Sequence, residues 1–184
     1  MKQQFLFILT FLSMMLLACT AQRNYYKLYK MEDFDLNAGN LFIKKIQYLP
    51  AINDISIVDT KADGNDFVVN RQWILIATTK TDQPNYYNIK KRAQELLVHP
   101  DSLINCVKVF YKIGVNGFNR DSGHYRFRVV VGLTTNRGYL YIENRNVSLG
   151  DTLPATSVRN RDYQFNVVLT RQLDKNWFEY YETR

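Results

Sequence analysis

Polar and apolar residues alternate along much of the chain after residue 40. A period of two is typical of strands with one buried face, because successive side chains of a strand point to opposite sides of the sheet. The clearest runs are 107–113, 125–131 and 163–169, which we predict to be neighbouring strands over one core. The complete set of predicted strands is 41–48, 55–59, 67–79, 104–113, 125–133, 138–143, 163–170 and 177–183.

One segment has helical spacing instead. Its apolar stripe consists of Tyr86, Ile89, Ala93, Leu96 and Leu97, with the basic residues 90–92 turned mostly outward. We expect this helix to end at His99, because a residue that precedes proline avoids the α-helical region. The predicted fold class is therefore α+β, with a twisted, mainly antiparallel sheet of about seven or eight strands and one amphipathic helix. A two-sheet β-sandwich with the helix at one edge is the alternative.

The N-terminus has the pattern of an export signal. Lys2 precedes an apolar run of thirteen residues, 5–17, which fits a secretory h-region and is shorter than the ~20 residues of a transmembrane helix. The run ends in Leu16-Leu17-Ala18-Cys19, which resembles the lipobox of bacterial lipoproteins. This resemblance implies cleavage before Cys19 and a diacylglyceryl group on its sulfur. An ordinary signal peptide that is cut near Ala21 is the alternative.

The lipobox divides the chain into a signal peptide (1–18), a lipidated cysteine with its tether (19–38) and a single strand-rich domain (39–184). The residue after the cysteine is Thr20, not the aspartate that resembles an inner-membrane retention signal, and the resemblance therefore implies the outer membrane. No acidic cluster of the kind that resembles surface-export signals follows, which favours a domain facing the periplasm. Because two or more acyl chains anchor a protein stably, the membrane is an expected partner through Cys19.

Composition and charge limit the kinds of partner that we expect for this protein. The 184 residues are 46% hydrophobic, which suits a packed domain, and the formal charge is +7. In an exported protein this positive charge does not indicate a nucleic-acid partner. It suits a partner with negative charge, such as lipid headgroups, peptidoglycan carboxylates or an acidic protein surface. Cys106 would be the only thiol besides Cys19, so no disulfide is expected within the mature domain. We expect Cys106 to be a buried apolar residue in a strand.

Catalytic patterns are weak. A hydrolase that uses His124 with Asp121 is one hypothesis, but no nucleophile motif accompanies this pair. We expect His99 to lie at the C-terminus of the predicted helix, where it suits the unpaired carbonyls. Glu179 and Glu182 are three residues apart in a predicted strand, so they should point to opposite faces and cannot share a substrate. We predict no catalytic residue.

A metal site is not expected either. The acidic segment 59–66 is the one candidate. We interpret it as a turn between two strands, because Asp63-Gly64 is a strong turn former. Neither a metal nor another cofactor is predicted.

Arginines and C-terminal aromatic residues supply the predicted binding surface, because both kinds of residue are enriched at interfaces. Its candidates are Arg120, Arg126, Arg128, Arg137, Trp177 and Tyr181. The predicted function is a non-enzymatic binding or scaffold lipoprotein that contacts another envelope protein. Analogy with small lipoproteins of this class suggests an accessory of an envelope-spanning secretion machine. The alternative is a ligand-binding module for glycan, peptidoglycan or lipid.

Overall fold

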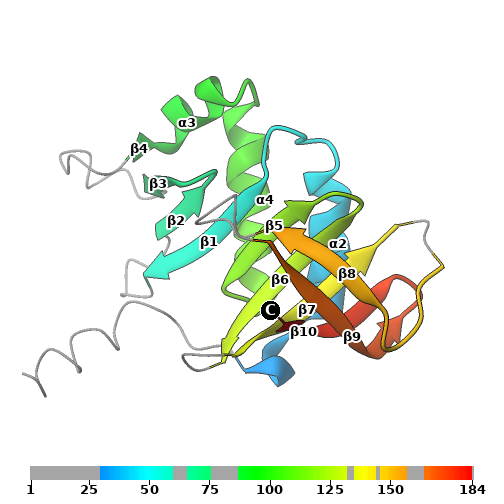
Figure 1. The fold of residues 1–184 in the computed structure, drawn as a ribbon. Coiled ribbons are helices and arrows are strands. Elements are labelled where there is room, and N and C mark those ends of the chain that lie inside the picture. Colours follow the sequence, from blue (N-terminus) through cyan, green and yellow to red (C-terminus); the bar gives the residue numbers. More distant parts are fainter. Residues whose placement is uncertain are drawn as a thin grey trace, which may run out of the picture.

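The computed structural model of the protein describes residues 30–59, 66–75, 87–131, 135–143, 146–156 and 164–183. Its strands form one ten-stranded sheet in the order β4-β3-β2-β1-β5-β6-β7-β10-β9-β8. The helices lie along one face of this sheet (Figure 1). The half of the sheet that consists of β6, β7, β10, β9 and β8 curls into a half-barrel. The structure therefore confirms an α+β fold with a twisted, mainly antiparallel sheet. The described strands form one sheet and not the two separate sheets of a sandwich.

The described elements differ from the predicted ones in number. There is a short 3-10 helix, η1, followed by three α-helices instead of one. The helices are η1 (Met31–Asp33), α2 (Leu36–Ile46), α3 (Ile89–Glu95) and α4 (Pro100–Lys112). The strands are β1 (Asp54–Asp59), β2 (Asp66–Val69), β3 (Gln72–Leu75), β4 (Tyr87–Asn88), β5 (Gly117–Asp121), β6 (His124–Val131), β7 (Thr135–Ile142), β8 (Thr152–Thr156), β9 (Gln164–Asp174) and β10 (Trp177–Thr183).

The prediction of a strand at 41–48 is wrong, because this segment lies mainly in α2. Phe42, Ile43 and Ile46 are buried at the spacing of three and four that a helix produces. The side chain of Asp35 caps the helix by accepting hydrogen bonds from the backbone N–H groups of Asn37 and Ala38, at 2.9 and 3.0 Å. This cap starts the helix before the apolar run that suggested a strand.

The predicted strand at 104–113 is also wrong, because α4 occupies it. Pro100 is the first helical residue, where its missing N–H costs nothing. The prediction took this proline as the end of a preceding helix, whereas it begins a new one. Cys106 is fully buried as expected, but in a helix that also buries Leu103, Val107 and Phe110.

The predicted helix is confirmed only in its centre, as α3. Ile89 and Ala93 are buried as expected, but Leu97 is 94% exposed. The helix ends early because Leu97 adopts a left-handed conformation with φ of 55°. The N–H groups of Leu97 and Val98 then bond back to the carbonyls of Gln94 and Ala93, at 3.0 and 2.9 Å. This is the Schellman arrangement that ends many helices.

Most predicted strands are confirmed, with three differences. The single strand expected at 67–79 begins as a hairpin of β2 and β3, whose turn residues Asn70 and Arg71 have positive φ. Neither strand β5 nor the edge strand β8 was predicted. The C-terminal strand β10 has the predicted bounds. The candidate turn at 59–66 lies largely outside the described residues.

Two cores stabilise the fold. The larger one lies between the helices and the sheet, where the ring of Phe42 contacts those of Phe110, Phe118 and Phe127. The smaller one fills the half-barrel on the opposite face. Its buried residues are Leu140, Ile142, Ala155, Phe165, Val167, Leu169, Phe178 and Tyr180.

The start of the described chain is packed against the domain. Phe34 stacks on Tyr139 with 3.7 Å between ring centroids, and the hydroxyl of Tyr139 donates to the carbonyl of Met31. The N–H of Asp35 donates to the carbonyl of Ile113 at 2.9 Å. Packing thus begins before the predicted domain boundary at 39. The predicted signal peptide and Cys19 lie outside the described residues.

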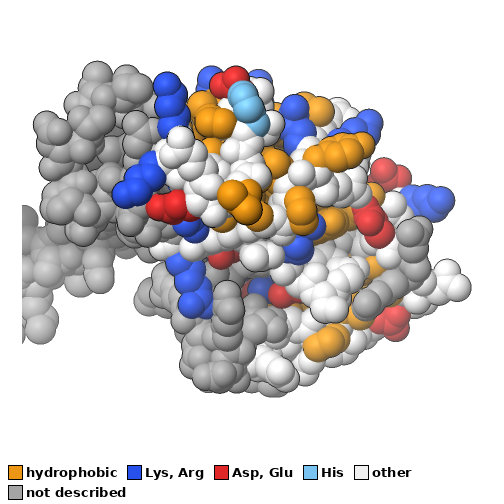
Figure 2. Space-filling model, turned by 90° about the horizontal axis from the view of Figure 1, so that it is seen from above, with side chains coloured by type: hydrophobic (Ala, Val, Ile, Leu, Met, Phe, Trp, Pro, Cys, Tyr) orange, Lys and Arg blue, Asp and Glu red, His pale blue; other side chains and the backbone are white. Residues whose placement is uncertain are grey.

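Basic side chains are prominent at one end of the protein. Figure 2 views the end at which α3 lies and shows Lys and Arg side chains around hydrophobic ones.

None of the helices in the described ranges is both long enough and apolar enough to cross a bilayer.

Candidate binding groove

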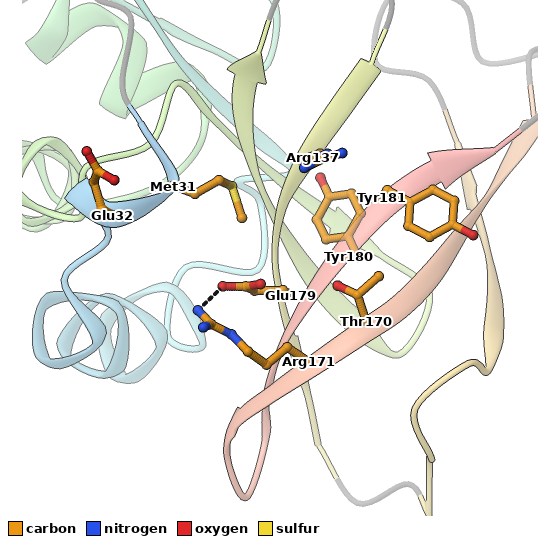
Figure 3. Close-up of a pocket in the computed structure, with 8 residues that line it drawn as sticks. All are labelled: Met31, Glu32, Arg137, Thr170, Arg171, Glu179, Tyr180 and Tyr181. Carbon is orange, nitrogen blue, oxygen red and sulfur yellow. Dashed lines mark hydrogen bonds and ion pairs between the residues drawn. The ribbon is translucent and has the colours of Figure 1, made fainter.

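An open groove lies where the N-terminal segment meets the C-terminal strands. Its volume is about 630 Å³. Two of the lining residues come from η1 on one side, and the others come from β7, β9 and β10 (Figure 3). The lining residues are Met31, Glu32, Arg137, Thr170, Arg171, Glu179, Tyr180 and Tyr181.

Strand register brings the polar side chains of the groove together. Arg137 of β7 is directly opposite Tyr181 of β10, and Glu179 of β10 is opposite Arg171 of β9. Residues that pair directly across a ladder point to the same side of the sheet. A bulge between Glu179 and Tyr180 shifts the β9 register and places Thr170 beside them.

Tyr139 connects this row of side chains to η1. It pairs with Glu179 across β7 and β10, and its hydroxyl holds the carbonyl of Met31. Burial, followed by the charge of Glu179, raises the pKa of Tyr139 to about 12. The phenol is therefore neutral at physiological pH and keeps its donor proton for Met31.

Most charged side chains that line the groove have an ion-pair partner in the described part of the chain, but Arg137 does not. Arg171 and Glu179 form an ion pair, and Glu32 is paired with Lys30 at 3.3 Å. Arg137 is exposed and has no hydrogen bond or ion pair with the described part of the chain. Tyr181, beside it, is 39% exposed. The groove therefore offers one unpaired guanidinium next to one accessible aromatic ring.

Two of the six residues predicted for a binding surface, Arg137 and Tyr181, meet in this groove. Trp177 does not: it is 1% exposed, packs against Phe34 and Phe127, and donates from Nε1 to Oδ1 of Asn40 at 2.8 Å. Its role in the structure is to join β10 to α2.

Arg120 closes the end of a helix. Its Nη2 donates to the carbonyls of Ile46 and Leu49 at 2.7 and 3.2 Å, and its Nε donates to that of Ile52 at 3.1 Å. These carbonyls lie at and just after the C-terminus of α2, where backbone acceptors lack helical partners. The guanidinium also lies over the ring of Tyr125.

Arg126 lies on the other face of the sheet, inside the half-barrel. It is 1% exposed and pairs with Asp121 at 3.0 Å and Glu182 at 2.9 Å, while its guanidinium covers the ring of Phe165. These contacts hold β5, β6 and β10 together.

Arg128 follows Arg126 on the same face and is partly buried. Its neighbours across the ladders are Gly117 and Gly138, and a Cβ atom at Gly117 would lie 2.8 Å from its Nη2. Glycine at 117 therefore makes room for the guanidinium. Burial, with a smaller effect of the nearby Arg126, holds the pKa of Arg128 below its usual value.

The pair His124 and Asp121 is present but enclosed. Nε2 of His124 lies 3.5 Å from Oδ2 of Asp121, the oxygen that also accepts from Arg126, and neither residue lines the groove. The two glutamates of β10 behave as predicted: Glu179 contacts Arg171, whereas Glu182 contacts Arg126. In the described part of the chain, no three His, Cys, Asp or Glu side chains are grouped as metal ligands.

Sequence reasoning missed Arg171 and Glu179. The signal available was their symmetric position about the polar segment Asp174-Lys175-Asn176, which makes them cross-strand partners of a hairpin. Met31 and Glu32 could not be assigned to the groove, because their position depends on contacts with strands far away in the sequence.

The fold and this groove define an α+β domain with an open polar groove on its sheet. Comparisons with known proteins give no matching family model, no matching curated protein and no matching solved structure.

Proposed function

We propose that this chain is a non-enzymatic lipoprotein of the outer membrane, anchored through Cys19 and facing the periplasm. It binds another envelope protein in the groove and acts as an accessory of an envelope-spanning secretion machine. The lipobox supports the anchor. Class analogy alone supports the choice of machine.

The observation that carries the proposal is the position of Arg137 and Tyr181 in the groove beside Met31. Met31 is twelve positions after Cys19, and an extended chain spans at most about 3.6 Å per residue. An acylated Cys19 would thus hold the groove within about 45 Å of the bilayer. A partner embedded in or crossing the envelope at this height is within reach.

The chemistry of the groove favours a protein partner. Arginine and tyrosine are common hot-spot residues, because both combine apolar contact area with directed hydrogen bonds. A carboxylate of the partner would pair with Arg137, and an apolar side chain would cover Tyr181. Catalysis by His124 and Asp121 is disfavoured because both side chains are buried, at 1% and 8% exposure, and Asp121 already holds Arg126.

The test is site-specific photocrosslinking in living cells. A photoreactive phenylalanine analogue replaces Tyr181, and in a second strain it replaces Tyr48, which is a more exposed tyrosine on the helical side. We expect one dominant crosslinked envelope protein from position 181 and none of the same mass from 48. Arg137→Glu should remove that product, whereas Lys175→Glu, an exposed control, should leave it.

The alternative ligand, a glycan or peptidoglycan, has its own outcome. The purified protein would then sediment with isolated peptidoglycan, and Tyr181→Ala would release it, since aromatic rings stack on sugars. Equal crosslinking from positions 181 and 48, together with no sedimentation, would exclude the groove as a binding site of either kind.

A further inference from the structure

A second surface, on the outer side of the helices, has a charge pattern that the groove does not use. Helices α2 and α4 carry four lysines: Lys44, Lys45, Lys108 and Lys112. In the described ranges none of these lysines forms an ion pair, and all except the half-buried Lys45 are exposed. The acids of these two helices lie at their starts: Asp101 in the first turn of α4 and Asp35 at the cap of α2.

The two helices present three of these lysines on one face. They pack side by side and run in opposite directions, because the N-cap of α2 is bonded to Ile113 at the end of α4. Each helix buries one stripe against the core. Lys44 on α2, and Lys108 and Lys112 on α4, lie on the stripes that point away from it.

Apolar side chains accompany the lysines. Leu41 and Tyr48 lie three residues before and four residues after Lys44, which places all three on one side of α2 and its C-terminal extension. Leu41 is 47% exposed and Tyr48 is 85% exposed. Basic residues around exposed leucine and tyrosine are typical of surfaces that lie on a bilayer, where apolar groups enter the headgroup layer and lysines contact lipid phosphates.

We propose that the outer face of α2 and α4 rests on the anionic lipid headgroups of the membrane that holds the anchor. The inference rests on the membrane location in the proposed function and adds a second contact to it. Tethering makes this contact intramolecular, so that a weak interaction suffices. Charge complementarity favours lipid: each lysine close to an anionic surface strengthens binding about fivefold.

The experiment measures this contact directly. The full chain with Tyr48→Cys is labelled at that cysteine with an environment-sensitive fluorophore and reconstituted into vesicles with or without phosphatidylglycerol. Cys106 is fully buried and should stay unlabelled, and mass spectrometry verifies the acyl group on Cys19. We expect a blue shift of the label only in vesicles that contain phosphatidylglycerol. Added salt should reverse it, because salt screens exposed charges.

Two triple variants distinguish the effect of the lysines on α2 and α4 from the effect of net charge alone. Lys44→Glu with Lys108→Glu and Lys112→Glu should weaken the contact at least about a hundredfold and abolish the blue shift. Lys30→Glu with Arg137→Glu and Lys175→Glu changes the charge equally on exposed positions elsewhere and should keep it. Identical spectra in the two kinds of vesicle, or equal loss in both triple variants, would refute the proposal.

The two proposals fail separately. The control triple variant contains Arg137→Glu, so it should lose the groove crosslink and keep the vesicle contact. If the helical triple variant does not fold, the salt titration of the labelled parent protein still decides: a blue shift that persists in high salt contradicts a charge-based contact.

Discussion

Arg126 and Glu182 form an ion pair across the half-barrel, with 2.9 Å between Nη1 and Oε1, although they are 56 positions apart in the chain. Arg126 is almost fully buried, and Asp121 holds its Nε from the other side. This pair ties the last strand, whose opposite face lines the groove, to the centre of the sheet.

Loss of this pair should be costly. Glu182→Ala leaves the buried guanidinium of Arg126 with one carboxylate partner fewer. We expect the free energy of unfolding to fall by about 3–5 kcal/mol. Glu179→Ala on the same strand is the matched control. It removes a pair whose arginine is 65% exposed, and should cost less than about 1 kcal/mol. Urea unfolding followed by circular dichroism compares the two; equal costs would contradict the buried role of Arg126.

Arginines 120 and 137 should respond differently to truncation. Arg120→Ala leaves the carbonyls after α2 without their donor and should destabilise the protein by about 2–4 kcal/mol. Arg137→Ala removes an exposed side chain and should change stability by less than about 0.5 kcal/mol. Thermal unfolding of both variants checks this. The prediction fails if Arg137→Ala is the more damaging change.

Leu97 should be replaceable with a gain in stability. Its positive φ is unfavourable for leucine, and its exposed side chain contributes little packing. Leu97→Gly should therefore stabilise the folded state by about 0.5–1 kcal/mol, because glycine is the residue preferred at this position of a Schellman motif. Leu97→Ala keeps the unfavourable conformation and should show no such gain in the same urea titration.

Cys106 should make the protein sensitive to alkaline pH. Burial raises the pKa of its thiol from 9.0 to about 12, so above pH 9 the unfolded chain loses a proton that the folded chain retains. Unfolding then becomes more favourable as pH rises, by up to about 1.4 kcal/mol per pH unit from this group, until the folded pKa is reached. Below pH 9 this contribution is constant.

The measurement is the midpoint of urea unfolding between neutral pH and pH 10. Cys106→Ala should lower stability at neutral pH through the lost packing, but its stability should fall less steeply above pH 9. The slope is the diagnostic quantity, since tyrosines also titrate in this range. Parallel curves for the parent protein and the variant would show that the thiol does not contribute.

The sequence predicted best those elements that local signals define. The last strand is an example, because the segment 177–183 was predicted as a strand with the bounds that β10 has. The prediction failed at α4. The apolar residues Val107, Val109, Tyr111 and Ile113 alternate by coincidence, but the residues that α4 buries follow helical spacing through the same segment. Pro100 could have resolved this, since proline begins helices as well as ending them.

The candidate site was only partly predictable for a similar reason. Arg126 has the same local pattern as an exposed arginine on a strand, and its burial depends on Glu182 at the far end of the chain. Arg137 has no such distant partner in the described ranges and lies at the surface as expected. Distinguishing the two required the order of strands in the sheet, which alternation alone does not encode.

The clamp between Tyr139 and Met31 has a mechanical consequence. Any pull on the chain before Lys30 reaches η1 first, and the hydroxyl of Tyr139 together with the stacked ring of Phe34 transmits it to β7. Strand β7 lies between β6 and β10 within the sheet, so the load is shared by two ladders of backbone hydrogen bonds. A force applied at Lys30 would thus act on the residues beside the groove before it could unfold the domain.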